Sequence, residues 1–288
     1  MRAIVAGRLR RLDKAQIANA RLIAAPVAAK LAAYDPGAAY GLPWGWSATG
    51  LLYDAGKAPK LLGGPPVSWA AALIPAMAGK LAPCGIALPD ARDEMFTAAW
   101  RLLGIDPARP RERDVKAAAD LIIRARKTVR LPASPDPIAA IAGGAVCLTF
   151  GDAAQAAIAS RRSRQGGEGS DIRHIQPREG GPLAIDALAE PRDAPHPDEA
   201  LALIDFLLRP AAAAKAIEAA GLASAETSAS PESFRSLWPV GAYDPRLAPV
   251  VEKEWARVRA PEPPAGKPSA KAASASATKP AKAKRTRR

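Results

Sequence analysis

Long apolar runs are missing from this sequence of 288 residues. A membrane-spanning helix needs about 20 consecutive, mostly apolar residues, so none is expected. Residues 1–6 are followed at once by Arg8, Arg10 and Arg11, where an export signal would continue with an apolar core. The residues by themselves therefore predict neither a membrane span nor a signal peptide.

Cysteine is also scarce. Cys84 and Cys147 are the only two, and they stand too far apart for the paired CxxC units of a zinc site. Two buried free thiols are the simplest interpretation, because a disulfide needs an oxidising compartment and no export signal is visible. No metal site is predicted.

Histidine and the nucleotide-binding motifs give no sign of catalysis. His174 lies in an expected strand and His196 in a proline-rich turn, so neither is placed as the base of a catalytic triad. Both are interpreted as structural or surface residues. The glycine clusters at 63–64 and 166–169 match neither a P-loop nor a GxGxxG turn. The residues point away from an enzyme and imply no cofactor.

Acidic residues are too few to balance the basic ones, and the formal net charge is +13. About half of this excess lies in residues 260–288, which hold eight Lys or Arg, one Glu and no large apolar residue. Such a segment cannot supply a core, so we predict a disordered tail. It could contact nucleic acid non-specifically through phosphates, although basic tails are more often simply solvated.

What is present is an alternation of helical and extended patterns. Over residues 90–104, Phe96, Trp100 and Leu103 recur at three- and four-residue steps, and Gly104 marks the end of a helix. Short runs bounded by Gly or Pro indicate strands. The alternation predicts an α/β body. Further helices are expected over 114–127, 200–208 and 210–221, and strands over 85–88, 145–150, 171–176, 183–189 and part of 41–53.

One stretch of the sequence points to a particular protein family. Residues 34–50, YDPGAAYGLPWGWSATG, resemble the segment that leads into the second lobe of the putrescine- and spermidine-binding periplasmic proteins of bacterial ABC importers. The likeness covers residues 1 to about 259. It continues in order through 68–69, 84–86, 90–96, 103–107, 144–151, 179–191, 198–200 and 207–210.

The resemblance implies a two-lobed, periplasmic-binding-protein-like (type II) α/β fold that closes on its ligand by a hinge motion. The solute-binding body would span 1–259, with a first lobe from about 1–43 and 170–259 and a second lobe from about 44–169. The tail 260–288 follows. Family members carry a long segment, including a signal peptide, before the residues that match 9–14. The first lobe is therefore expected to be incomplete.

The resemblance also implies a ligand set. A polyamine needs carboxylates for its ammonium ends and aromatic faces for its chain. Glu94 falls on the family's ammonium-binding glutamate, Asp186 on its cleft aspartate and Ser134 on a polar cleft residue. The plainer interpretations are a helix-start acid for Glu94 and a turn former for Ser134. A charge within the apolar strand around Asp186 instead needs a cleft or ion-pair role.

Several positions depart from the family pattern. Asp152 stands where the family has a tryptophan, and Gln155 where it has an aspartate. Ala184 and Leu222 replace an aromatic residue and a tyrosine. Each lost aromatic face removes about 0.5 to 2 kcal/mol of binding free energy, so weak binding is expected. Asp152, as a new carboxylate, would partly compensate.

The two cysteines align with a pair that is disulfide-bonded in putrescine-binding relatives. The resemblance therefore implies a Cys84–Cys147 disulfide and a periplasmic location, in place of free thiols. Without an upstream signal, the start at Met1 would instead imply a cytoplasmic location.

The leading interpretation is the substrate-binding component of a polyamine-type ABC transporter with an altered or weakened ligand site. Its partners would be a polyamine or another cationic small molecule and the transporter permease. One alternative is a truncated remnant that binds nothing. Another is nucleic-acid association through the basic tail.

Overall fold

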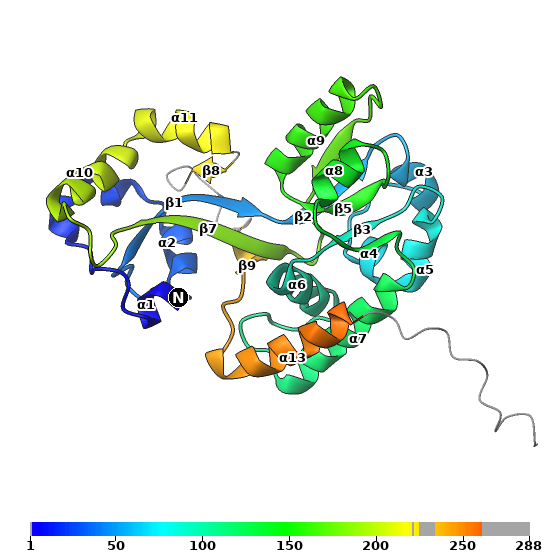
Figure 1. Cartoon of the computed structure of the whole chain (residues 1–288), viewed down its shortest axis with the longest axis horizontal. Helices are drawn as coiled ribbons and strands as arrows, with labels where there is room; N and C mark the ends of the chain where they lie inside the picture. The colour runs from blue at the N-terminus through cyan, green and yellow to red at the C-terminus, as the bar shows by residue number, and fades with distance from the viewer. Residues whose placement is uncertain (1, 221, 225–233, 261–288) are drawn as a thin grey trace, which may run out of the picture. The chain divides into compact units, whose positions relative to one another are not determined.

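The computed structural model describes residues 2–220, 222–224 and 234–260 (Figure 1). The main compact unit ends at Val258. Nearly all of the predicted disordered tail, residues 261–288, lies outside the described residues. No helix in the described part of the chain is long and apolar enough to cross a membrane.

The first sheet has four strands in the order β8, β1, β7, β9. Its centre is the long antiparallel pair of β1 and β7, with Ala48 opposite Leu183 at one end and a bulge between Pro43 and Gly45. β9 runs parallel to the start of β7. The bounds are Gly41–Ala48 for β1, Gly181–Ala189 for β7, Ala223–Ser224 for β8 and Leu237–Pro239 for β9.

Helices cover both faces of this sheet (Figure 1). Alternate side chains of a strand point to opposite faces, so Leu183 and Leu188 of β7 enter different cores. Leu183 packs with Val27 of α2, and Leu188 packs with Leu201 of α10. The bounds in this part are Arg2–Val5 for α1, Lys14–Gln16 for η1, Ala18–Leu22 for η2, Ala25–Leu31 for α2, Pro197–Leu207 for α10 and Pro210–Ala220 for α11.

The second sheet joins β5, β2 and β6 to the parallel pair of β3 and β4 through a bridge between Ile86 and Leu148. β2 is antiparallel to both of its neighbours. The carboxyl ends of the other four strands and the amino end of β2 therefore meet at one edge. The bounds are Gly50–Asp54 for β2, Ala87–Pro89 for β3, Leu131–Ser134 for β4, Leu148–Gly151 for β5 and Ile172–Ile175 for β6.

The core beside this sheet is rich in aromatic side chains. Phe96 and Trp100 of α6 are fully buried with ring centroids 5.4 Å apart, and Trp69 stacks on Phe150 at 4.7 Å. The expected helix is confirmed, although Leu103 lies past its end and is exposed. The helices here are α3 Ala58–Leu62, α4 Ala70–Leu73, α5 Pro75–Ala78, η3 Gly79–Leu81, α6 Arg92–Leu102, α7 Glu112–Arg126, α8 Pro137–Ala142, α9 Ala153–Gln165, η4 Pro245–Leu247 and α13 Ala248–Arg259.

Two short segments connect the sheets. Thr49 alone separates β1 from β2, and residues 176–180 link β6 to β7. The Thr49 N–H donates to the Pro182 carbonyl at 3.0 Å. Gly180 has a φ of +78°, and a Cβ there would lie 1.8 Å from the Ser236 carbonyl oxygen, so this position accepts only glycine.

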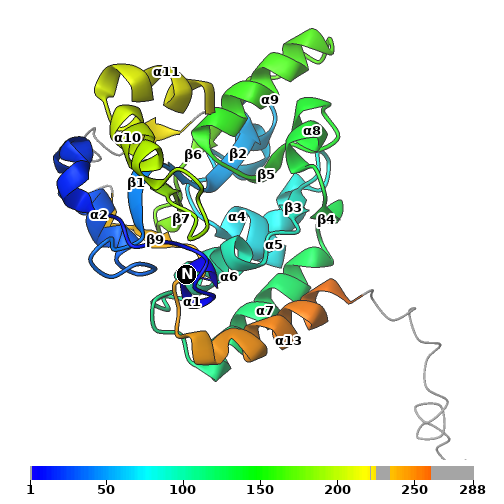
Figure 2. The same ribbon diagram turned by 60° about the vertical axis from the view of Figure 1, so that its left-hand side comes forward.

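The lobe boundaries expected from the sequence stay predictions, and the two sheets divide the chain in their own way. β1 extends past residue 43 to Ala48, because it pairs with β7 along its whole length. Residues 172–175, assigned to the first lobe, pair with β2 of the second sheet. The chain also returns to the second sheet at its end, because the apolar stripe of α13 (Val251, Trp255 and Val258) packs in the same core as α6 and α7 (Figure 2).

Cys84 and Cys147 form a disulfide, with their Cα atoms 5.4 Å apart. Cys84 lies in the turn before β3, and Cys147 immediately precedes β5. The free-thiol interpretation is therefore wrong, and the pairing implied by the resemblance is present.

Replacing both cysteines (Cys84→Ser with Cys147→Ser) is expected to lower the free energy of unfolding by about 2 to 4 kcal/mol. The bridge closes a sequence separation of 63 residues, and opening it enlarges the conformational entropy of the unfolded chain. Urea unfolding of the oxidised wild type and the double variant measures the difference. The reduced wild type should match the double variant. Equal stability of oxidised wild type and double variant would contradict this assignment.

Candidate functional site

Polar side chains gather where the strands of the second sheet end. Pro89 pairs with Ser134, and Gly151 pairs with Gly50, so these four residues mark one edge, here called the carboxyl edge. Open α/β sheets bind ligands outside the carboxyl ends of their strands. The carboxyl edge is therefore the part of this sheet best suited to hold a ligand.

Glu94 reaches this edge from the first turn of α6, the helix that follows β3. Asp93 and Glu94 are both in that turn, where carboxylates complement the helix dipole. The two side chains have different partners. Asp93 accepts from the Arg92 guanidinium at 2.7 Å, whereas Thr49 is the hydrogen-bonding neighbour that lowers the pKa of Glu94. Glu94 is thus tied to the segment that connects the two sheets.

The surroundings of Glu94 disfavour its charge. Burial raises the pKa of the Glu94 carboxyl above its ordinary value, and the negative charges of Asp152 and Asp93 raise it further. The hydrogen bond from Thr49 opposes this shift. Among the described residues, no Lys or Arg is one of the groups that shift this pKa. A bound cation would relieve the repulsion between these carboxylates.

Asp152 and Gln155 serve first as structural residues. Asp152 precedes α9, and its Oδ1 accepts from the Gln155 N–H at 2.8 Å. The Gln155 Oε1 in turn accepts from the Asp152 N–H at 3.0 Å. This reciprocal pair is a capping box that starts α9. Asp152 nevertheless brings a second carboxylate to the carboxyl edge, close enough to raise the pKa of Glu94.

Ser134 and Asp186 lie in different surroundings. Ser134 is buried at the end of β4, opposite Pro89 on the carboxyl edge. Asp186 lies on β7 of the other sheet, opposite Gly45, and its side chain is exposed. Water therefore solvates the Asp186 carboxylate, which needs no ion-pair partner at this exposed position. The ligand roles of both residues stay predictions.

The structure also describes Ala184 and Leu222, the two positions at which the family has an aromatic residue and this chain does not. Ala184 is exposed on β7, and Leu222 is half-buried after α11. Neither offers a flat ring for stacking. The structure thus places carboxylates at the carboxyl edge without aromatic side chains at these two positions.

Sequence reasoning missed Thr49 in this region and interpreted His174 as a structural or surface residue. Thr49 lies in residues 34–50, the stretch that carries the family resemblance. Its position between two expected strands was the sequence feature that could have drawn attention to it. His174 lies on β6, and its Nε2 is 2.5 Å from where a Cβ on Gly50 would stand. Burial lowers the pKa of the imidazole, which the charge of Asp152 and the Ala48 backbone oppose. The ring keeps a structural role against Gly50.

Comparison with known proteins decides the family. Residues 1–238 match the family described as bacterial extracellular solute-binding protein. The chain belongs to this family. Members of this solute-binding family are not enzymes, in agreement with the sequence analysis. In the part of the chain that the structure describes, no group of three His, Cys, Asp or Glu side chains could hold a metal ion.

Two curated relatives illustrate the likeness of this solute-binding protein. The putrescine/agmatine-binding protein of Pseudomonas aeruginosa is 29% identical over 274 residues, covering 89% of this chain and 75% of its own. The putrescine-binding periplasmic protein of Escherichia coli is 28% identical over 277 residues, covering 90% and 75%. The resemblance seen in the motifs is thereby confirmed.

Solved structures confirm the fold. The spermidine/putrescine ABC transporter substrate-binding protein of Streptococcus pneumoniae has a TM-score of 0.72 at 15% identity, covering 89% of this chain and 79% of its own. A lipoprotein of Treponema pallidum has a TM-score of 0.72 at 20% identity, covering 89% and 80%. The solute-binding protein thus has the expected two-lobed α/β fold.

Glu94→Gln is expected to stabilise the folded protein relative to wild type increasingly as the pH rises above the ordinary glutamate pKa, until it passes the raised pKa of the folded state. The folded state holds the Glu94 proton more tightly than the unfolded state. Wild type therefore loses stability as the pH rises above the ordinary glutamate pKa of about 4.3. Glutamine carries no such charge, so its variant escapes this loss.

Urea unfolding across this pH range measures the difference. The matched control is Glu112→Gln, exposed in the first turn of α7, whose difference from wild type should stay nearly constant. A Glu94→Gln difference as constant as that of the control would contradict the description of the site.

Proposed function

We propose that this solute-binding protein binds a polyamine or another small organic cation at the carboxyl edge and presents it to the permease of an ABC transporter. The observation that carries the proposal is the position of Glu94 and Asp152, which lie at the starts of α6 and α9 on the carboxyl edge. The pKa of Glu94 is raised there, and no basic group of the described residues is among the causes of the shift. An ammonium group supplies the missing positive charge. The names of the relatives, which refer to putrescine and agmatine, support this ligand class.

The site is expected to bind more weakly than a site with a complete aromatic cage. Exposed Ala184 offers no ring, and Asp152 stands where a tryptophan face is expected. A cation–π or stacking contact contributes about 0.5 to 2 kcal/mol, so losing several weakens binding by about two powers of ten. Ser134, Gln155 and Asp186 complete the proposed ligand set as polar groups.

The proposed location is the periplasm. The Cys84–Cys147 disulfide requires an oxidising compartment to form and persist. The curated relative from Escherichia coli is named as periplasmic. A bridge between β3 and β5 would also hold the strands that carry Glu94 and Asp152 to the carboxyl edge.

The alternative function is a remnant that no longer binds. It is favoured by the use of the Asp152 side chain as a helix cap, which leaves less of that carboxylate for a ligand, and by the missing ring at Ala184. A third candidate, nucleic-acid association through the basic tail, falls outside the described residues.

Calorimetric titration with putrescine and spermidine separates these functions. Wild type should bind weakly, and Glu94→Gln should weaken binding by about 10- to 100-fold, because charge-assisted hydrogen bonds contribute about 1.5 to 3 kcal/mol. Asp152→Asn should also weaken it while keeping the cap of α9, since asparagine caps helices as well as aspartate. Glu112→Gln is the matched control and should bind as wild type does.

Restoring a ring tests the weakened site directly. Ala184→Phe should strengthen binding by about 2- to 30-fold, the equivalent of about 0.5 to 2 kcal/mol. The substitution is on an exposed position of β7, so folding should be unaffected. If neither wild type nor Ala184→Phe binds either amine, the non-binding alternative is correct.

A further inference from the structure

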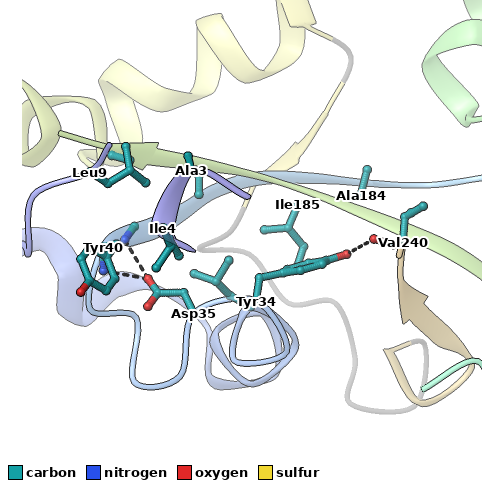
Figure 3. Close-up of a pocket in the computed structure, with 13 residues that line it drawn as sticks. Ala3, Ile4, Leu9, Tyr34, Asp35, Tyr40, Ala184, Ile185 and Val240 are labelled. Atoms are coloured by element: carbon teal, nitrogen blue, oxygen red, sulfur yellow. Dashed lines mark hydrogen bonds between the residues drawn. The ribbon is translucent and has the colours of Figure 1, made fainter. Parts of the chain in front are cut away.

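A third connection between the two sheets leads from β9 of the first sheet to η4 and α13 beside the second. It comprises residues 240–244. At its first-sheet end, the Val240 N–H donates to the Leu183 carbonyl at 3.1 Å, and the Tyr34 hydroxyl donates to the Val240 carbonyl at 2.6 Å (Figure 3). Both backbone groups of Val240 are thus held by β7 and by the turn after α2.

The other end of the third connection lies against the first turn of α6. Gly241 has a φ of +72°, and a Cβ there would stand 3.0 Å from the Asp93 Oδ2. The buried Tyr243 donates its hydroxyl to the Asp93 Oδ1 at 3.4 Å, and its ring meets Trp100 of α6 edge-on. The Asp93 carboxylate therefore contacts the third connection at two of its residues.

Asp93 is itself fixed in place. The Arg92 guanidinium donates to both Asp93 carboxylate oxygens, at 2.7 and 3.0 Å, and it also pairs with Glu252 of α13. The charge of Asp93 acts on two tyrosines. Burial raises the pKa of Tyr34, and it raises the pKa of Tyr243 to about 12, while the Asp93 charge adds to both shifts. Both hydroxyls therefore keep their protons at neutral pH and can donate.

The same turn of α6 carries Glu94, the carboxylate of the proposed amine site. Successive residues of an α-helix point about 100° apart, so the two side chains face different surroundings. Asp93 meets the third connection, and Glu94 meets Thr49 at the carboxyl edge. A change in the angle between the two sheets moves Val240 relative to α6, and the Asp93 contacts transmit this movement to the turn that holds Glu94.

We propose that Asp93 is a positioning residue that couples amine binding at Glu94 to the angle between the two lobes. Its side chain acts through the third connection and not on the ligand. By holding this connection to α6, it keeps the ligand-free protein within a narrow range of angles. Loosening the contact lowers the fraction of binding-competent molecules, and the apparent affinity falls by that fraction. The coupling to the amine rests on the proposed function, whereas the hold on the angle does not.

Two substitutions loosen the contact in different ways. Tyr243→Phe removes the hydroxyl and keeps the ring, whereas Asp93→Asn removes the charge and keeps the shape. The control for the first is Tyr53→Phe, in the same core but at the far end of β2 from the carboxyl edge. The control for the second is Asp198→Asn, exposed in the first turn of α10.

The angle is measured by double electron–electron resonance between spin labels on the two lobes. The labels are attached at Lys116→Cys on α7 and Glu199→Cys on α10, both exposed positions. Cys84 and Cys147 are bridged and stay unlabelled. Without ligand, Tyr243→Phe and Asp93→Asn should broaden the distribution of distances, and both controls should match wild type.

Calorimetry with putrescine measures the coupling. Tyr243→Phe should weaken binding by about 3- to 10-fold, as expected for the loss of one hydrogen bond, and Tyr53→Phe should bind as wild type does. A contact with a structural role only would lower stability in urea and leave both distances and affinity unchanged. Tyr34→Phe loosens the opposite end of the connection and should also broaden the distances, which keeps the test valid if Tyr243→Phe folds poorly.

The remaining outcomes separate the coupling from the proposed function. Unchanged distances in Tyr243→Phe, Tyr34→Phe and Asp93→Asn would overturn the proposal. So would weaker binding by Asp93→Asn with unchanged distances, because the effect on Glu94 would then be purely electrostatic. Broadened distances in the variants, with no amine bound by wild type, would reject the proposed function and uphold the hold of Asp93 on the angle.

Discussion

The close packing around Thr49 is the constraint on which the rest of the structure depends. This residue separates a strand of one sheet from a strand of the other, and the residue after it, Gly50, and the residue packed against its carbonyl, Gly181, must both be glycine. A Cβ on Gly50 would lie 2.4 Å from the Ile175 carbonyl oxygen, and one on Gly181 would lie 2.7 Å from the Thr49 carbonyl oxygen. With this backbone held, Thr49 lies close enough to Glu94 to lower the pKa of its carboxyl. The junction thereby connects the fold of both sheets with the chemistry of the carboxyl edge.

Without a bound cation, the carboxylates at the carboxyl edge repel each other. Helix dipoles favour acidic residues at the starts of α6 and α9, and both helices start at the same edge because β3 and β5 run parallel. Folding therefore brings Glu94 close to Asp152, where burial and repulsion raise the pKa of Glu94. A site with such strain between like charges responds to an ammonium group more strongly than separate surface carboxylates would.

Local patterns in the sequence predicted the elements, and distant contacts decided the rest. The spacing of Phe96 and Trp100 and the glycine at 104 predicted α6 correctly, since helical periodicity is a local property. The helix starts after Ala91, whose side chain makes no capping hydrogen bond. The return of α13 to the second core depends on contacts with α6 that no local pattern reveals.

In the candidate site, too, the sequence predicted some residues and distant contacts decided the others. Motif resemblance pointed to Glu94, Ser134 and Asp152, and the strand order brings all three to one edge, which composition alone could not show. Thr49 was missed because its role comes from a contact 45 positions away in the sequence, with Glu94. The exposed position of Asp186 was unpredictable from its apolar neighbours, because alternation in β7 depends on which residues β1 and the helices cover.

The central claim is that Glu94 is a half-buried carboxylate whose charge a bound cation stabilises. NMR titration of its side-chain carboxyl carbon, with and without saturating putrescine, tests this most directly. The account predicts a pKa above the ordinary glutamate value of about 4.3 in the free protein and a clear fall when the amine is bound. An ordinary pKa in the free protein, unchanged by the amine, would contradict it.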